Sequence, residues 1–234
     1  MRRRDFIKLG SMAIFSPLFV GCGKGDQMSE KYHEINMPEF SHSRLHSQLD
    51  RLLAAYEDKG MNVSDTLLPA LSEKEIRDQC TWFPGELTQE IISLYSWRGG
   101  QQNDAWETKH PFWFRDNSFS SLARAQTEYQ SMMNSYGKNP EDHEMLKYSF
   151  PFASFNGGWY VLPTRKHDFN PSLKSPVISV LQGIDVYYYT IESMVNTCID
   201  WVSRPEFDSD YTLPEDIEMQ IWKKHNPRIF EYET

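Results

Sequence analysis

Three histidines are the first side chains in this sequence that could bind a metal ion. His42 and His46 lie one helical turn apart, a spacing that lets two imidazoles share an ion, and His33 lies upstream. No carboxylate falls on the same helix face to complete a set of ligands. Solvated residues near the start of a helix are the simpler interpretation, so no metal site is expected.

Two cysteines, Cys80 and Cys198, each fall on the apolar face of an expected helix. In an oxidising compartment a disulfide between them is permitted, and it stays open as an alternative. The sequence fixes no distance between the two, so we interpret them as small buried hydrophobic residues. No Cys-x-x-Cys pair is present, so neither a redox motif nor structural zinc is indicated.

Acidic side chains are plentiful, but no arrangement typical of an enzyme accompanies them. Two carboxylates could pair for general acid–base catalysis, and the candidates include Glu86, Glu90, Asp104 and Asp116. Because the chain is so acidic, solvated surface residues are the simpler interpretation. The sequence has no Gly-x-Ser-x-Gly, no His-Glu-x-x-His and no phosphate-cradling glycine loop. We therefore expect no catalytic residue, no cofactor and no small-molecule substrate.

The N-terminus carries an export signal. Its first residues include the run RRDFIK over 3–8, which is similar to the twin-arginine export motif. The apolar run 13–20 that follows is too short to cross a membrane as a mature helix, and this pattern is typical of a signal peptide. The residues that match the motif are Arg3, Arg4, Phe6 and Lys8.

A lipid-attachment signal follows the export signal. The apolar run ends at Gly21-Cys22, which resembles a lipobox, with Phe19 where leucine is usual. We expect residues 1–21 to be removed, Cys22 to receive the lipid, and 22–37 to form a flexible tether. The protein would then be lipid-anchored on the periplasmic side of a cell membrane or outer membrane. An uncleaved anchor, or an ordinary signal with an incidental cysteine, is the alternative.

The charge of the chain indicates its kind of partner. The formal net charge is −9, and residues 1–21 contribute four basic residues against one acidic residue, so the chain from Cys22 onward carries −12. Such a negative field repels nucleic acid and attracts basic partners. A basic protein is therefore the expected partner, and nucleic acid is not.

The segment 67–100 combines two expected helix starts with a glycine stop. Ser72 and Glu75 have the spacing of a capping box, which begins a first helix. Pro84 suits the first position of a second helix, because its fixed φ and missing N–H are tolerated there. Gly99 would supply the left-handed residue that commonly ends a helix.

This segment also resembles a known family. The stretches LPALSEKEI over 68–76, FPGELTQEIISLY over 83–95 and WRGG over 97–100 resemble the entry segment of the SUKH superfamily, and a weaker resemblance continues to about Arg204. That superfamily contains bacterial immunity proteins against polymorphic toxins and fungal regulators of cell-wall glucan synthesis. Its motifs describe a fold and include no catalytic residue, so the resemblance implies a binding protein.

The rest of the chain predicts the fold class. We expect a single α+β domain over 38–204, in which a mainly antiparallel sheet of about five or six strands is flanked by about four helices, with 205–234 as a docked extension. Apolar periodicity and turn residues predict further helices over 43–56, 121–133, 191–202 and 214–225, strands over 112–114, 148–155, 159–162, 177–181 and 186–189, and an exposed loop over 137–144.

A contact surface is expected where the second helix of the 67–100 segment ends. Aromatic and arginine side chains often dominate protein interfaces, although aromatics equally often fill a core. The residues expected to meet a partner are Trp97, Arg98, Gln101 and Trp106. The resemblance to the SUKH superfamily implies that Trp113 and Asn156 lie nearby if the family arrangement holds.

Two hypotheses for function follow from the resemblance and the export signals. The first is a non-enzymatic immunity protein that neutralises a polymorphic or contact-delivered toxin. The alternative is a cell-envelope scaffold or glycan-binding lipoprotein, in which exposed aromatic side chains such as Trp106 would stack on sugars.

Overall fold

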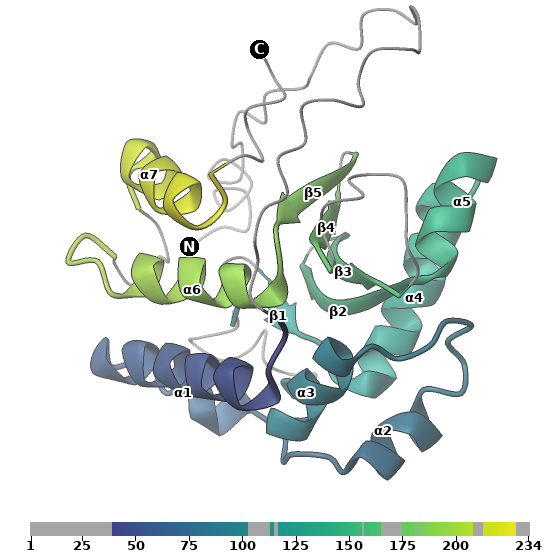
Figure 1. The fold of residues 1–234 in the computed structure, drawn as a ribbon, viewed down its shortest axis with the longest axis horizontal. Coiled ribbons are helices and arrows are strands. Elements are labelled where there is room, and N and C mark those ends of the chain that lie inside the picture. Colours follow the sequence, from purple (N-terminus) through teal and green to yellow (C-terminus); the bar gives the residue numbers. More distant parts are fainter. Residues whose placement is uncertain are drawn as a thin grey trace, which may run out of the picture.

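The computed structural model describes residues 39–102, 113–114, 117–155, 157–164, 175–181, 183–207 and 213–227. Within them, seven α-helices surround one antiparallel sheet, which confirms the α+β class (Figure 1). The helices are α1 (His42–Asp58), α2 (Glu73–Gln79), α3 (Gln89–Trp97), α4 (Leu122–Tyr136), α5 (Pro140–Lys147), α6 (Ile191–Val202) and α7 (Glu215–His225), with the short 3-10 helix η2 (Val63–Thr66) after α1.

The sheet is a meander of five strands that follow one another in chain order. Each neighbouring pair is antiparallel, so β1 and β5 form the two edges. The hairpin between the second and third strands is the one that the sequence predicts, and Gly157 turns it with a φ of 83°. The strands are β1 (Ser118–Phe119), β2 (Ser149–Phe155), β3 (Gly158–Pro163), β4 (Val177–Val180) and β5 (Ile184–Tyr188).

Both faces of the sheet are covered by helices. Successive side chains of a strand point to opposite faces, and in β3 Trp159 and Val161 belong to one hydrophobic cluster while Tyr160 and Leu162 belong to another. The smaller cluster contains residues of α4 and α5, and the larger contains residues of α1, α3 and α6. Every side chain of β3 is therefore buried.

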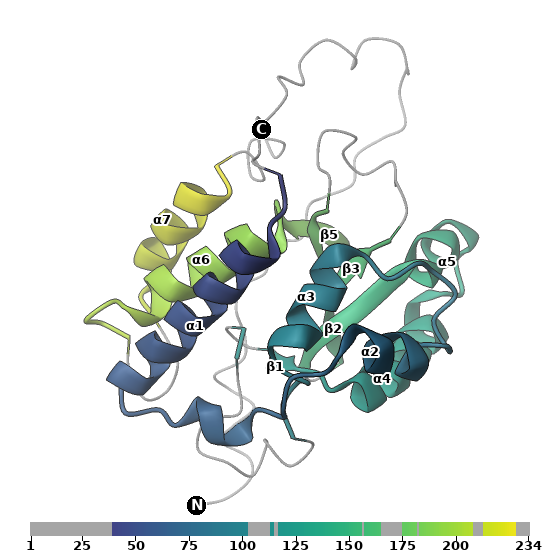
Figure 2. The ribbon, with the colours of Figure 1, turned by 60° about the horizontal axis from the view of Figure 1, so that its bottom comes forward.

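Three helices lie side by side on the larger cluster. Figure 2 shows α1, α6 and α7 as neighbours, and α6 is in contact with both of the others. The fully buried Asn226 joins the end of α7 to α6: its Oδ1 accepts from the Tyr189 amide (3.1 Å) and the Ser193 hydroxyl (3.0 Å), and its Nδ2 donates to the Thr197 hydroxyl (3.2 Å). With Trp222 in the same core, α7 is part of the packed domain.

The capping box of Ser72 and Glu75 forms as predicted, but the second helix of the 67–100 segment begins later than predicted. Residues 84–88 are not helical: 84–85 form a bend, and Thr88 has an extended backbone. Helix α3 begins at Gln89, because the Thr88 hydroxyl caps it by accepting from the Ile91 amide (3.4 Å). The prediction that Pro84 occupies the first helical position was therefore wrong.

The residue with positive φ after α3 also differs from the prediction. Gly100, with φ of 96°, takes the left-handed conformation, whereas Gly99 does not. A Cβ at Gly100 would lie 2.5 Å from the Ser121 amide nitrogen, so only glycine fits at this position.

Two further predictions from breaker residues and aromatics were wrong. The predicted loop over 137–144 contains the start of α5, since proline at the first helical position leaves no hydrogen bond unmade. The short strand expected at 112–114 is β1 instead, at Ser118–Phe119, because that is where the backbone pairs with β2; Phe114 makes one isolated bridge to Asn117, and Phe112 lies outside the described residues. Of these two elements only α5 adds a helix, and the described part of 38–204 contains six α-helices, α1 to α6, where about four were expected.

Candidate interaction surface

Trp97 lies in the interior at the C-terminal end of α3. Its side chain is 4 % exposed and stacks on the fully buried Trp113, with ring centroids 5.3 Å apart. Its Nε1 donates to the carboxylate of Asp50 on α1 at 2.8 Å. A stacked pair of buried indoles contributes packing energy to the fold. Neither side chain is presented to a partner in this structure, in contrast to the expectation from the sequence.

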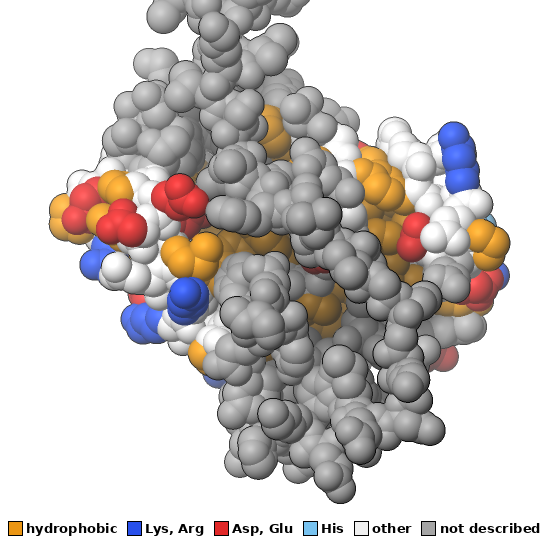
Figure 3. All heavy atoms as spheres, turned by 90° about the horizontal axis from the view of Figure 1, so that it is seen from above, with side chains coloured by type: hydrophobic (Ala, Val, Ile, Leu, Met, Phe, Trp, Pro, Cys, Tyr) orange, Lys and Arg blue, Asp and Glu red, His pale blue; other side chains and the backbone are white. Residues whose placement is uncertain are grey.

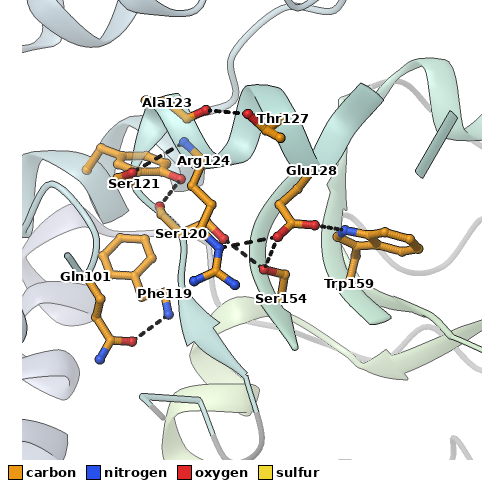
Figure 4. A network of polar contacts seen from close by, with 11 residues as sticks. Gln101, Phe119, Ser120, Ser121, Ala123, Arg124, Thr127, Glu128, Ser154 and Trp159 are labelled. Carbon is orange, nitrogen blue, oxygen red and sulfur yellow. Dashed lines mark hydrogen bonds and ion pairs between the residues drawn. The ribbon is translucent and has the colours of Figure 1, made fainter. Parts of the chain in front are cut away.

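Gln101 is also an interior residue, 1 % exposed. Its side-chain Nε2 donates to the Thr66 hydroxyl (3.0 Å), while its Oε1 accepts from the Phe119 amide (2.8 Å; Figure 4). Its own backbone N–H donates to the Phe119 carbonyl at 2.7 Å. The side chain therefore joins η2 to the edge strand β1, and it is not an accessible contact residue as expected.

Arg98 is the predicted contact residue that remains partly accessible. Its guanidinium carbon lies 5.0 Å from the centre of the Trp97 ring, and its Nη1 donates to the Trp97 carbonyl at 2.8 Å. Such a cation–π contact at a partly exposed site contributes about 0.5–1 kcal/mol. Arg98 and the exposed Asp50 thus form a polar rim over the buried indole. Sequence reasoning missed Asp50, because nothing local links it to a tryptophan 47 positions away.

The other residues predicted to contact a partner, to direct export or to carry the lipid lie outside the described residues. Trp106 and Asn156 belong to this group. So do the export and lipidation residues Arg3, Arg4, Phe6, Lys8 and Cys22, and these assignments stay predictions.

A second polar network fixes α4 to the sheet. The carboxylate of Glu128 accepts from Arg124 Nε (3.3 Å), the Ser154 hydroxyl (2.9 Å) and Trp159 Nε1 (2.5 Å), as Figure 4 shows. The pair Arg124–Glu128 spans one helical turn, and the other two donors come from β2 and β3. Three donors on one mostly buried carboxylate make this network part of the packing. Only the one-turn spacing of Arg124 and Glu128 could have indicated it.

The histidines of α1 each contact a neighbouring residue. His42 Nε2 lies 2.8 Å from Gln89 Oε1, and His46 Nε2 lies 2.9 Å from the Ser93 carbonyl. In the part of the chain that the structure describes, no group of three or more His, Cys, Asp or Glu side chains is placed to hold a metal ion.

The two cysteines are buried thiols, the interpretation that the sequence favours over a disulfide. Burial raises the pKa of the Cys80 thiol to about 12, so it stays protonated and uncharged at neutral pH. Cys80 therefore behaves as a small apolar residue.

A shallow groove opens beside the N-terminal end of α3. It has a volume of about 480 Å³ and lies between α2 and the non-helical residues 84–88. Its lining mixes apolar, polar and charged groups: Arg77, Cys80, Gly85, Glu86, Leu87 and Gln89.

Acidic side chains are placed at two exposed helix ends. The last turn of α1 contains Glu57 and Asp58 and no basic residue. The first turn of α7 exposes Glu215 and Asp216, and Met219 is exposed one turn later. Figure 3 shows red acidic and orange hydrophobic side chains together at its left margin, where Figure 1 places α7 and the loop before it.

No helix among the described residues is both long enough and apolar enough to cross a membrane. Comparison with known protein families gives no matching family, and no curated protein matches the chain. The SUKH resemblance therefore rests on the residues of 67–100 that carry it.

Proposed function

We propose that this chain is a non-enzymatic immunity protein that binds and neutralises a basic protein toxin. It would be anchored through a lipid at Cys22 on the periplasmic side of a membrane. Three features of the chain support the proposal: the SUKH-like segment 67–100, the twin-arginine and lipobox-like signals, and the strong excess of acidic residues. An immunity protein on the periplasmic side would meet a toxin that acts on peptidoglycan or lipid.

The placement of charge at the end of α1 is the structural observation that carries the proposal. Cations are favoured near a helix C-terminus, where the macrodipole is negative, and each misplaced anion costs about 0.3–1 kcal/mol. Glu57 and Asp58 occupy that position, exposed, and make no ion pair with any described residue. Their position gives no benefit to the helix, but a basic partner would relieve the repulsion on binding.

The proposed mechanism is occlusion of the toxin. A negative surface speeds the encounter with a basic protein, and this attraction weakens as salt rises because mobile ions screen it. Affinity then depends on a few desolvated contacts at the centre of the interface. The protein would need no chemistry of its own, since a covered toxin cannot reach its target.

A competition experiment tests the proposal. A strain that lacks this gene is grown in contact with wild-type siblings under conditions in which contact-delivered toxins are secreted. We expect the mutant to be lost from the mixture and to be rescued by the gene in trans. Equal survival in every such condition would show that the protein is not an immunity factor.

The location has its own test. Inhibition of lipoprotein signal peptidase should cause a longer precursor to accumulate, and Cys22→Ser should have the same effect without inhibitor. If neither treatment changes the mass of the protein, the lipid anchor is not formed. Immunity itself is judged separately by the competition experiment.

The alternative of a glycan-binding scaffold requires exposed aromatic rings for stacking on sugars. Within the described residues, the large hydrophobic side chains that are exposed are Leu181 and Met219, neither of which is aromatic. This alternative therefore depends on aromatic side chains outside the described residues, such as Trp106 and Tyr211. Sedimentation with purified peptidoglycan separates the two, because an immunity protein should stay in the supernatant.

A further inference from the structure

Helices α1 and α3 run in the same direction. Three contacts between them recur at a constant offset of 47 residues: His42 with the Gln89 amide oxygen (2.8 Å), His46 with the Ser93 carbonyl (2.9 Å) and Asp50 with Trp97 Nε1 (2.8 Å). Because each step along α1 meets the corresponding step along α3, the two helices are parallel, and their N-terminal ends lie together.

Helix α6 has the same direction as α1, beside which it lies in Figure 2. In the first turn of each helix, Arg44 donates to Glu192 through Nε (2.7 Å) and through Nη2 (3.1 Å). Just beyond the other end of both helices, Lys59 Nζ donates to the Arg204 carbonyl at 2.6 Å. A helix is electrically positive at its N-terminus and negative at its C-terminus. The three negative ends therefore point in the direction of the acidic last turn of α1.

The chain enters the domain at the N-terminal ends of these helices and is held there. Arg44 Nη2 also donates to the Glu39 carbonyl. Phe40 is half-buried, packs against the larger hydrophobic cluster and meets the His42 ring edge-on, with ring centroids 5.4 Å apart. Glu192, the acceptor of Arg44, is only 8 % exposed. One guanidinium therefore joins the incoming backbone to α6.

An ion pair of this kind fixes geometry more than it stabilises a fold. The planar guanidinium makes two parallel bonds to the carboxylate, which sets the direction as well as the distance between the two groups. Taking the Glu192 charge out of water offsets much of the attraction between the two charges. The pair is therefore suited to hold the entering chain in one place.

We propose that the Arg44–Glu192 pair is a clamp that orients the domain on the membrane. Since the chain from the lipid at Cys22 enters at the N-terminal ends of α1, α3 and α6, these ends would face the bilayer. Helix α1 has 17 residues, so its acidic last turn would lie about 25 Å farther from the lipid surface, accessible to a partner. This arrangement rests on the lipid anchor of the proposed function, whereas the clamp itself stands on the contacts above.

Tether length and charge favour the same orientation. If 22–37 forms the flexible tether that the sequence predicts, its root-mean-square length is about 20–25 Å, and the entry point stays near the lipid surface. A bilayer with anionic lipids has a negative surface potential. That potential repels Glu57 and Asp58 together with the negative helix ends, so the acidic end of α1 is kept away from the bilayer.

The orientation is tested on the chain from Cys22 onward, coupled through the Cys22 thiol to a maleimide lipid. Cys80 and Cys198 are 5 % and 2 % exposed, so they should not compete in the coupling. Bicelles of phosphatidylcholine and phosphatidylglycerol carry a gadolinium-chelating lipid, whose effect on amide relaxation in NMR falls steeply with distance. We expect the Ser43 amide to relax roughly threefold or more faster than the Asp58 amide, given about 25 Å between the helix ends. Equal relaxation of the two, or the reverse order, would overturn the orientation.

The clamp is tested by a variant that removes both of its charges. Arg44→Met/Glu192→Met leaves neither charge unpaired, which keeps the cost in stability small. We expect the NMR order parameter of the Phe40 amide to fall from about 0.85 to below about 0.6. The difference in relaxation between the ends of α1 should fall as well. Arg44→Lys keeps the charge but cannot make the two parallel bonds, so it should give an intermediate order parameter.

Arg51→Met is the matched control. It removes an exposed arginine two turns further along α1 that makes no ion pair with any described residue, and it should change neither measurement. If the double variant and Arg44→Lys both behave like Arg51→Met, then Arg44 and Glu192 do not hold the chain.

The competition experiment keeps this proposal apart from the proposed function. If wild-type protein protects although both ends of α1 relax equally, the orientation fails and immunity stands. If wild-type protein gives no protection while the N-terminal ends face the bilayer, immunity fails and the orientation stands. Coupling through Cys22 in vitro does not depend on lipidation in the cell, which the signal-peptidase test judges separately.

Discussion

The two ends of α3 use their polar side chains in opposite ways. At the C-terminal end, the Trp97 indole donates to Asp50, and the Gln101 amide bonds to both Thr66 and Phe119. At the N-terminal end, Glu86 stands at the rim of an open groove without an ion pair to any described residue. The first end is closed by hydrogen bonds that stay within the chain, and the second presents an exposed carboxylate.

This difference teaches where a partner surface can be found. Aromatic and amide side chains near a double glycine have the composition of an interface, but here they fill and join the core. A buried polar group needs a hydrogen-bond partner, so the polar atoms of such residues already bond to other atoms of the fold. An exposed charge such as Glu86, which makes no ion pair with a described residue, is not used in that way within the described fold.

Removal of the Trp97 side chain should give the largest effect at the closed end. Trp97→Ala leaves a cavity beside Trp113 and removes the indole that donates to Asp50. We therefore expect a loss of about 3–5 kcal/mol in the free energy of unfolding, measured by urea denaturation followed by circular dichroism. Trp97→Phe keeps an aromatic ring but not the Nε1 donor, and should lose about 1–2 kcal/mol. If Trp97→Ala lowers the free energy of unfolding by less than about 1 kcal/mol and the variant no longer protects against toxin, this end of α3 is the contact surface.

Gln101→Leu should give the next largest effect. The change leaves the Phe119 amide and the Thr66 hydroxyl buried without their present partner, which costs about 2–3 kcal/mol. Gln102→Leu is the matched control, because the neighbouring side chain is exposed and its replacement should alter stability by about 0.5 kcal/mol or less. If the two leucine variants are equally stable, Gln101 does not join η2 to β1 in solution.

The elements that sequence reasoning located correctly are those whose signals are local. The hairpin of β2 and β3 follows from Asn-Gly-Gly between two β-branched and aromatic runs, and α1, α4 and α6 follow from apolar periodicity with polar caps. The start of α3 depends on a different kind of information. Gly85 packs against Thr164, the residue that directly follows β3, and no local pattern contains that contact.

The candidate site was harder to predict than the fold for a similar reason. Whether Trp97 faces solvent depends on Trp113 and on Asp50, which is 47 positions away. The sequence identifies residue types that suit an interface, but aromatic side chains suit a core as well. The groove was not predicted at all, because it lies between α2 and the non-helical residues 84–88, which were expected to be helical.

Asp50 gives a smaller and more specific test of the rim at the closed end. Asp50→Ala removes the acceptor of Trp97 Nε1, and we expect a loss of about 1 kcal/mol in the free energy of unfolding. Asp50→Asn should lose less, since an amide oxygen can still accept the bond. If Asp50→Ala is as stable as wild type, the bond from Trp97 Nε1 to Asp50 does not stabilise the fold in solution.

The smallest effect is expected from the capping box that begins α2, the helix on the other side of the groove. The Ser72 hydroxyl donates to the Glu75 carboxylate at 2.6 Å and the Ser72 amide donates at 2.8 Å, and together they hold the pKa of Glu75 below its ordinary value of 4.5. Because the folded pKa is the lower one, this contribution to stability is present in full above about pH 4.5 and is lost as the pH falls through the folded value.

Ser72→Ala tests this through an NMR titration of the Glu75 side chain. The variant keeps the backbone donor but loses the hydroxyl, so the midpoint should rise toward 4.5 without necessarily reaching it, and stability should depend less on pH in the acidic range. Arg77 lies two residues further along the same short helix, and its position in the groove depends on where that helix begins. An unchanged midpoint would mean that the Ser72 hydroxyl does not bond to Glu75 in solution, and the cap would then not fix the start of α2 on which the position of Arg77 depends.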